Sequence, residues 1–328
     1  MIVYRFGVKN RGGTLLTITF GMMLNQMAGL FLLLVVGFLL NRLHILPKET
    51  ETVLSRVAAK LLLPAFMIYT VMEECTVENL MTHGNLVIYG AVFQVTGIFA
   101  AVLLAKWLGK GDPFLSGVYR YALAFPNIGG FGFPIVMALF GEFGLFQYQL
   151  YMMSNHFLCY AWGVGQMQPA HERGGLREAI KKLFNPVVIG VLIGMFLGLT
   201  GFVCFIPTGI RTTVENLGNC FSPMSLLLTG FVIADYRFSE ILKDKRTYII
   251  ALLRLILIPG AFLVVLRLLH LPDMLCVLTC LAFACPCGMN TVVFPAAYGQ
   301  DTRPGAGLTL LTSTAAVVTI PLLMAIMG

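Results

Sequence analysis

Two apolar stretches of the chain contain proline, asparagine and glycine where an uninterrupted helix would otherwise be expected. Residues 125–134 are FPNIGGFGFP, and residues 285–295 are CPCGMNTVVFP. Proline removes a backbone donor and clashes with the preceding turn, so a helix is expected to break in each stretch. A helix that restarts inside a membrane presents free backbone N–H groups and the positive end of its dipole. Such an end can bind a carboxylate without a buried cation.

The candidate substrate-binding positions are the proline, asparagine and glycine residues of the two breaks. They are Pro126, Asn127, Gly129, Gly130, Pro134, Pro286, Gly288, Asn290 and Pro295. The two asparagines would add neutral donors or acceptors, and the glycines would allow close approach to the backbone. The alternative is that proline and glycine merely kink two packed helices. Matched breaks in the two halves of a membrane chain favour a transport site.

Three further polar residues are expected inside membrane spans. Asn155, His156 and Ser313 are candidates for lining the route or for coupling. Protonation of His156 could couple transport to protons, and a neutral histidine bonded to a neighbouring helix is the favoured alternative. Arg120 and Arg254 precede the two breaks; they could attract anions or snorkel to the membrane interface, and snorkelling is the favoured interpretation.

The composition is that of a polytopic membrane protein. Hydrophobic residues make up 58% of the chain and charged residues 11%, against roughly 25% charged in soluble domains. The formal charge of +7 is therefore attributed to loops facing the cytoplasm and not to nucleic-acid binding. Cys285 and Cys287 stand two positions apart at the start of the second break without a nearby His, Asp or Glu, so we expect buried packing, no metal and no cofactor.

Ten apolar runs are long enough, or nearly so, to cross a bilayer as helices. They are residues 24–40, 57–72, 86–108, 114–140, 145–165, 185–203, 214–234, 248–268, 274–298 and 305–327.

The second five runs resemble the first five. Pro64 and Pro223 fall in the second span of each half, 159 positions apart, and Pro134 and Pro295 are 161 positions apart. An odd number of spans per repeat forces the copies to enter the membrane in opposite senses. The sequence thus predicts an all-α fold of two inverted repeats, 23–167 and 183–328, joined by a cytoplasmic linker at 168–182, with broken helices four and nine.

Lys and Arg residues concentrate in the connections after the odd-numbered spans, whereas the opposite connections contain only Arg211 and Arg267. The positive-inside rule therefore predicts a multi-pass cell-membrane protein with both termini outside. Arg5, Lys9 and Arg11 disagree with this orientation. They lie in an N-terminal extension, residues 1–22, that comes before the first span. Met22 and Met23, where this extension ends, are alternative starts of translation.

The sequence resembles the auxin efflux carrier family, including its bacterial malate permease-like members. The resemblance is carried by LLLPAFMIY at 61–69, the first break extended to 141, LFNPVVIGVLIGMFLGL at 183–199, FSPMSLLLTG at 221–230 and TSTAAVVTIPLL at 312–323. It implies a fold similar to that of bile acid sodium symporters. Spans one, two, six and seven would form a scaffold, often a homodimer interface, and spans three to five and eight to ten a mobile transport unit. The linker is short, so regulation by a long cytoplasmic loop is not implied.

The expected function is secondary active transport of a small organic anion across the lipid bilayer, with a proton or sodium ion as the candidate coupling ion. An anion channel or facilitator with the same fold is the alternative. An enzyme is not expected, because no Asp or Glu lies deep inside a span apart from the border residues Glu142 and Asp235. No GxxxxGK[ST] sequence is present, so ATP-driven transport is not supported within this chain.

Overall fold

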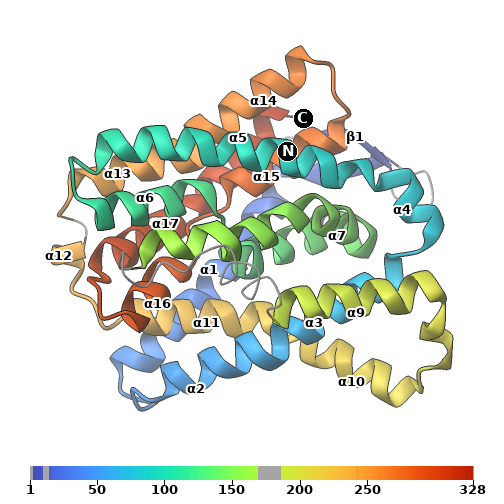
Figure 1. Cartoon of the computed structure of the whole chain (residues 1–328), viewed down its shortest axis with the longest axis horizontal. Helices are drawn as coiled ribbons and strands as arrows, with labels where there is room; N and C mark the ends of the chain where they lie inside the picture. The colour runs from blue at the N-terminus through green and yellow to red at the C-terminus, as the bar shows by residue number, and fades with distance from the viewer. Residues whose placement is uncertain (1–2, 10–14, 169–185, 242, 328) are drawn as a thin grey trace.

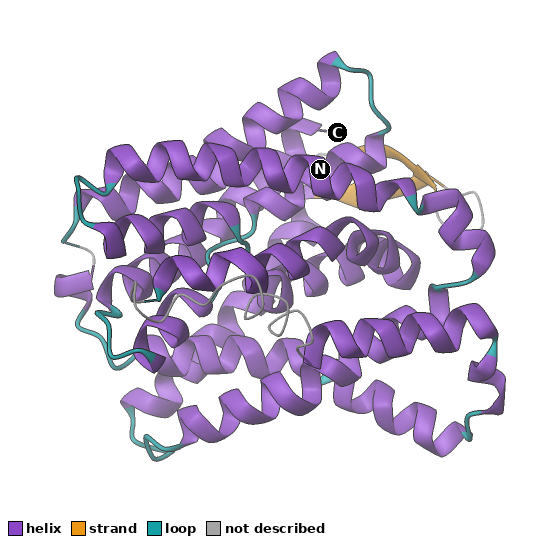
Figure 2. Cartoon of the chain, in the orientation of Figure 1, coloured by secondary structure: helices purple, strands orange, loops and turns teal. Residues whose placement is uncertain are grey.

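The computed structural model describes residues 3–9, 15–168, 186–241 and 243–327, and nearly all of them are helical (Figure 2). The exception is an N-terminal hairpin of two antiparallel strands, β1 (Val3–Lys9) and β2 (Leu15–Thr19). The hairpin lies beside α15 and the start of α1. The predicted linker, apart from Gln168, and residue Gly328 lie outside the described residues.

The first half contains helices that are joined by short turns or run directly into one another. They are α1 (Phe20–Arg42), α2 (Thr50–Val57), η1 (Ala58–Leu62), α3 (Leu63–Glu74), α4 (Val77–His83), α5 (Asn85–Leu108), α6 (Pro113–Ala124), η2 (Ile128–Gly132), α7 (Phe133–Leu158), η3 (Cys159–Gly163) and η4 (Val164–Met167).

The second half begins, within the described residues, at Pro186. Its helices are α9 (Pro186–Thr200), η6 (Phe202–Phe205), α10 (Thr208–Asn219), α11 (Phe221–Ile233), α12 (Phe238–Ile241), α13 (Lys245–Leu252), η7 (Leu253–Leu257), α14 (Ile258–Leu268), α15 (Asp273–Ala284), α16 (Asn290–Ala297) and α17 (Arg303–Met327).

Within the described residues, seven helical stretches are long and apolar enough to cross a membrane. They are Gly21–Arg42, Thr50–Glu74, Asn85–Leu108, Ile128–Met167, Thr208–Ile233, Lys245–Leu268 and Arg303–Met327. Two shorter helices, α9 and α15, are also apolar. Large side chains such as Ile88, Phe99 and Phe196 are exposed on these helices, as expected for surfaces that face lipid. The protein is therefore a multi-pass membrane protein with a helical body.

The stretch Ile128–Met167 bends at Gly141, which has φ 68° and ψ −165° inside α7. Positive φ is readily adopted by glycine and strained for other residues. The bend lies between the predicted fourth and fifth runs. The stretch is 40 residues long, about twice what one crossing needs.

The helices form two packed groups, which touch each other where α1 packs on α17 (Figure 1). In one group, α1 packs on α11 and α3 packs on α9 and α10. In the other, α5 packs on α6 and α7, α14 on α15, and α17 on α13 and α15. Two glycines bring α1 and α11 into backbone contact, because a Cβ on Gly37 would collide with the Leu227 carbonyl and one on Gly230 with the Leu34 carbonyl.

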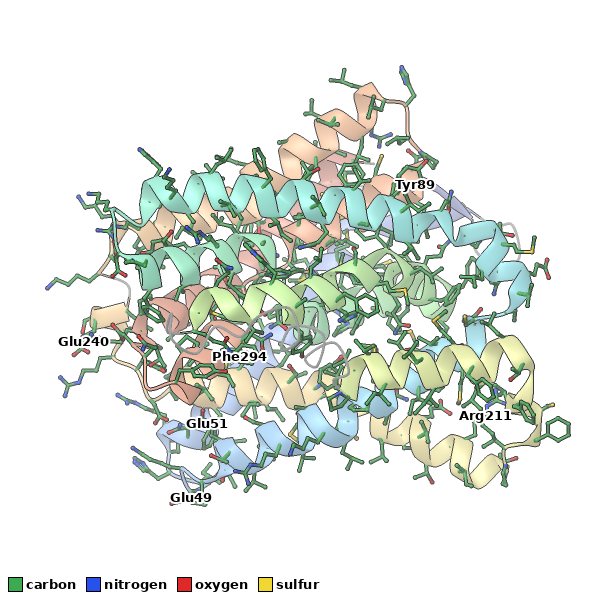
Figure 3. The ribbon with its side chains drawn as sticks, viewed as in Figure 1. Glu49, Glu51, Tyr89, Arg211, Glu240 and Phe294 are labelled. Atoms are coloured by element: carbon green, nitrogen blue, oxygen red, sulfur yellow. The ribbon has the colours of Figure 1, made fainter. Side chains whose placement is uncertain are left out.

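The connections gather at the two ends of the helix bundle. Figure 1 shows the start of α2, the α5–α6 turn and α12 at one end, and α4 and the α9–α10 connection at the other. Figure 3 shows Glu49 and Glu240 at the first end and Arg211 at the opposite end, where it forms an ion pair with Glu73.

Widened π-helical turns precede three of the prolines. η1, η2 and η7 end two residues before Pro64, Pro134 and Pro259 respectively. A proline inside a helix cannot donate to the carbonyl four residues earlier and clashes with it. Each such carbonyl lies in the widened turn, which relieves the clash.

Candidate substrate-binding site at the helix breaks

The two stretches singled out from the sequence lie against each other. α6 ends at Ala124 and α15 ends at Ala284, and the following residues, Phe125 and Cys285, are extended. Pro126 and Cys287 form an isolated antiparallel bridge. In this bridge the backbone N–H of Asn127 donates to the Pro286 carbonyl at 2.8 Å. Two helix interruptions distant in sequence are thus joined by a main-chain hydrogen bond.

Asn127 starts the helix that follows the first interruption. Its Oδ1 accepts a hydrogen bond from the backbone N–H of Gly130 at 3.0 Å, as a helix N-cap does. Its Nδ2 is buried and has no hydrogen-bond partner among the described residues. Gly288 packs on it, since a Cβ there would lie 3.6 Å from the Asn127 Cα. The Asn127 Oδ1 therefore caps the helix, and its Nδ2 could donate a hydrogen bond to a ligand.

Asn290 is the first residue of α16, and its side chain reaches back to α6. Its Nδ2 donates to the Tyr121 hydroxyl at 2.7 Å, and that hydroxyl also contacts the Cys159 thiol at 3.0 Å. Beside it, the Thr291 hydroxyl donates to the Gly288 carbonyl at 2.9 Å. The amide of Asn290 thus ties the second interruption to the helix that precedes the first.

The structure contradicts the expectation that Arg254 snorkels to the interface. The side chain is fully buried in η7. Its Nε donates to the Cys285 carbonyl at 3.0 Å and its Nη1 donates to the Leu123 carbonyl. Its Nη2 is buried without a partner among the described residues. Carbonyls at helix C-termini lack intrahelical donors, so satisfying these two explains why the long cationic side chain stays inside.

Gln94 of α5 makes the corresponding contact in the first half. Its Nε2 donates to the Ala124 carbonyl, the last residue of α6, at 3.1 Å. Gln94 and Arg254 are 160 positions apart, as are the helix ends Ala124 and Ala284. Each interrupted helix therefore ends against a polar side chain from the span before it. The first-half residue is neutral and the second-half residue is charged.

Two of the other lining candidates, Asn155 and Ser313, lie beside residues that contact the interruptions. Asn155 donates to the Gln94 Oε1 at 3.0 Å and so supports the α6 end. Ser313 is buried beside Thr312, whose hydroxyl accepts a hydrogen bond from the Cys287 N–H at 3.0 Å. The Ser313 Oγ has no partner among the described residues.

The His156 ring lies 6.3 Å from the ring of Phe133, the first residue of α7 after the first interruption. It lines a small, mostly apolar cavity of about 20 Å³ between α3, α7 and α9, together with Gln149, Met67 and Val191. That volume is close to what one water molecule needs. The His156 Nε2 is buried without a partner among the described residues. His156 thus lies where the two helix groups face each other.

The remaining predicted positions pack around the place where the two interruptions meet, which we call the crossover. A Cβ on Gly129 would lie 2.6 Å from the Phe221 ring, and the Gly129 carbonyl accepts from Ser222 at 3.1 Å. η2 therefore touches α11 of the other helix group. Pro134 and Pro295 were expected to end the two breaks. They lie instead inside the resumed helices, near the start of α7 and within α16.

The cysteines at the second interruption are buried thiols. Cys285 and Cys287 are both free and buried, and the Cys287 Sγ donates to the Ala122 carbonyl at 3.5 Å. Among the described residues, no group of three or more His, Cys, Asp or Glu side chains could hold a metal ion.

Comparison with known proteins assigns the fold to a family. The sequence profile of the family described as "Membrane transport protein" matches residues 22–324. The chain belongs to this membrane transport family. It is the auxin efflux carrier family that the sequence motifs resemble. The matched region begins after the hairpin, so the family assignment rests on α1 to α17.

One curated relative is similar to part of the chain. It is an "Uncharacterized transporter" of Methanothermobacter thermautotrophicus, 24% identical over 211 residues, which are 63% of this chain. The chain spans 66% of the length of that relative. Both comparisons agree on membrane transport, and a transport family is not an enzyme family.

Sequence reasoning did not identify Gln94 or Tyr121 as residues that contact the crossover, and for Arg254 it favoured snorkelling over anion attraction. Gln94 and Arg254 carried a usable signal, because each is an isolated polar residue within an apolar run, and such residues face the protein interior by default. Tyr121 had no comparable signal, since tyrosine is common in spans and near interfaces.

Proposed function

We propose that this membrane transport protein is a secondary active carrier of a small organic anion such as a carboxylate. The proposal rests on one observation above all. Two interrupted helices meet at the Asn127–Pro286 hydrogen bond, and the buried Arg254 guanidinium lies against both helix ends. Resumed helices point the positive ends of their dipoles into the crossover. The partial charges and the full charge of Arg254 all favour an anion.

Unpartnered donors strengthen the case for an anionic ligand. The Asn127 Nδ2 and the Arg254 Nη2 are both buried without a hydrogen-bond partner among the described residues. Leaving a buried donor unsatisfied costs about 1–3 kcal/mol, and more for a charged group. A carboxylate that reached the crossover during transport would remove this cost.

We further propose ten spans in two inverted five-helix repeats. The bend at Gly141 would divide Ile128–Met167 into two crossings, and α9 and the α15–α16 pair would supply two more beyond the seven long stretches. α6 and α15 support the repeat. Each has 12 residues, and each ends two positions before a proline. The repeats would be residues 23–167 and 183–328.

The two packed helix groups suggest how access would alternate. We assign α1, α2–α3, α9 and α10–α11 to a scaffold and the remaining long helices to a transport unit. η2 contacts α11 across the boundary, and the cavity lined by His156 lies at the same boundary. An elevator or rocking motion of the transport unit would carry the crossover past this surface. A homodimer would form through the scaffold.

Orientation and coupling complete the proposal. The excess of Lys and Arg at the end that carries Glu49 and Glu240 supports a cytoplasmic location for that end, with both termini outside the cell membrane (Figure 3). A proton or a sodium ion would couple the cycle, and His156 is the candidate proton carrier because it lies at the boundary of the two groups.

Counterflow in proteoliposomes tests the carrier. Organic acids would first be ranked by the thermal stabilisation of the purified protein, and the best would be loaded inside vesicles. A carrier should then accumulate labelled anion transiently against its gradient, and the uptake should saturate. The competing candidate is an anion channel or facilitator of the same fold. Unitary currents without counterflow would establish the channel and contradict the carrier.

A further inference from the structure

A basic cleft lies at one end of the bundle, between the end of α5 and the start of α13. Its volume is about 580 Å³. The cleft is lined by charged side chains and by three apolar ones. These residues are Trp107, Leu108, Lys110, Lys243, Asp244, Lys245, Arg246 and Ile249. None of the residues that meet at the crossover lines this cleft.

The positive charge of the cleft is not neutralised within the described residues. Lys110, Lys243 and Lys245 are exposed and have no carboxylate partner there. The one acidic residue of the cleft, Asp244, is already engaged. Its Oδ1 accepts from the Arg246 N–H at 2.9 Å and lies 3.8 Å from the Arg246 Nε. Three lysines thus remain for an anion.

Apolar surface continues from the cleft along both helices. Trp107 is 73% exposed at the last turn of α5, where aromatic side chains typically mark the membrane interface. Further along α5, Leu103 and Phe99 are exposed, and along α13 and η7, Leu252 and Ile256 are exposed. The site therefore combines a group of three lysines with exposed apolar surface on two helices. A small soluble anion would contact the lysines alone, whereas a phospholipid would contact both the lysines and the apolar surface.

We propose that this cleft binds an anionic phospholipid, with the headgroup phosphate on Lys110, Lys243 and Lys245 and the acyl chains along Trp107 and Ile249. Basic pockets at the ends of membrane helices suit such headgroups, and juxtamembrane lysines attract anionic lipid by several-fold each. The bound lipid bridges α5 and α13, which belong to different halves of the chain.

Trp107 is a built-in reporter for this site. The chain has two tryptophans, Trp107 and Trp162, so Trp162→Phe leaves Trp107 as the sole emitter. The protein is reconstituted in phosphatidylcholine vesicles that contain either brominated phosphatidylglycerol or brominated phosphatidylcholine. Quenching of Trp107 should be stronger with phosphatidylglycerol, corresponding to a preference of roughly fivefold or more. Raising NaCl to about 0.5 M should reduce the preference, because exposed charges are screened.

A charge-matched pair of triple variants locates the site. Lys110→Gln, Lys243→Gln and Lys245→Gln together should abolish the preference, and the three Lys→Arg changes should retain it. The control removes equal charge from the far side of the same end, through Lys48→Gln, Arg56→Gln and Lys60→Gln, and should leave the preference unchanged. If the Gln triple is poorly folded, Lys243→Gln alone should lower the preference at least twofold.

Three outcomes would overturn the proposal. Equal quenching by the two lipids in the parent would show no headgroup selectivity. Retained selectivity in a folded Gln triple would place the lipid elsewhere. Displacement of brominated phosphatidylglycerol by millimolar glycerol phosphate or inorganic phosphate would show that the cleft binds soluble anions and not lipid.

Discussion

The Arg254 Nε donates to the Cys285 carbonyl at 3.0 Å, across 31 positions of sequence. The same guanidinium donates to Leu123, which precedes the other interruption. One buried cation thereby satisfies carbonyls at the ends of both α6 and α15. Because burying an unpaired charge is unfavourable, such an arrangement persists only where the carbonyls, and in our proposal a transported anion, compensate for the charge.

Arg254→Met should destabilise the protein. The change removes the desolvation cost of the cation but leaves two buried carbonyls without donors, each bond to a charged group contributing about 1.5–3 kcal/mol. A net loss of about 3 kcal/mol is expected in the free energy of unfolding, measured in detergent by thermal or denaturant unfolding. Arg254→Lys should lose less, because the charge and one donor remain.

The exposed Arg237 provides the control for Arg254. Its side chain lies at the bundle end and is 84% exposed, so Arg237→Gln should leave unfolding unchanged. An Arg254→Met variant with the stability of the parent would show that the two carbonyls do not depend on the guanidinium.

Gln94 and Asn155 should be energetically coupled. Asn155 donates to the Gln94 Oε1, and Gln94 donates to the α6 end. A double-mutant cycle with Gln94→Leu and Asn155→Leu should show a coupling of about 0.6 kcal/mol, with ~1.7 kcal/mol as the upper limit seen between membrane helices. Strictly additive losses would argue that the hydrogen bond between the two amides contributes nothing.

Asn127→Leu should weaken anion binding more than it weakens the fold. Leucine keeps similar bulk but removes the free Nδ2 donor, and a charge-assisted bond contributes about 1.5–3 kcal/mol, or about tenfold or more in affinity. Affinity for the best organic acid is measured beside the yield of folded protein. Unchanged affinity in a well-folded variant would exclude Asn127 as a ligand.

Asn290→Leu should affect folding and binding together, because its Nδ2 is already bonded to Tyr121. Tyr121→Phe is the matched test, since it removes the same hydrogen bond while leaving the asparagine in place. If Asn290 also contacts the substrate, Asn290→Leu will lower affinity more than Tyr121→Phe does. Equal effects of the two variants would assign Asn290 a positioning role alone.

Native Cys204 can report the orientation of the chain. It is exposed between α9 and α10, at the end predicted to lie outside. Cys220 is also exposed, so the test starts from Cys220→Ser. In that variant a membrane-impermeant maleimide should label Cys204 in intact cells, and adding Cys204→Ser should abolish the signal. In the Cys204→Ser background, Glu49→Cys at the opposite end should label only after permeabilisation. The reverse pattern would invert the proposed topology.

The sequence alone was sufficient for the class, for most of the apolar helices and for the two places where a helix stops beside a proline. These follow from local chemistry: a run of apolar residues must be helical in lipid to satisfy its backbone, and proline removes a donor wherever it stands. Residues 125–127 and 285–289 accordingly lie between helices, and the motifs identified the family that the profile match confirms.

The tertiary structure decided which side chains serve the interruptions. The orphan carbonyls at Leu123, Ala124 and Cys285 are a local consequence of broken helices, but their donors come from other spans. From sequence alone, Arg254 could equally snorkel outward, since a long cationic side chain near the end of a predicted span can reach water. Packing of η7 against both helix ends removed that option. The carbonyl to which a buried side chain donates depends on which helix packs beside it. That packing is set by residues far apart in the sequence, so the local sequence around Gln94 or Arg254 does not predict it.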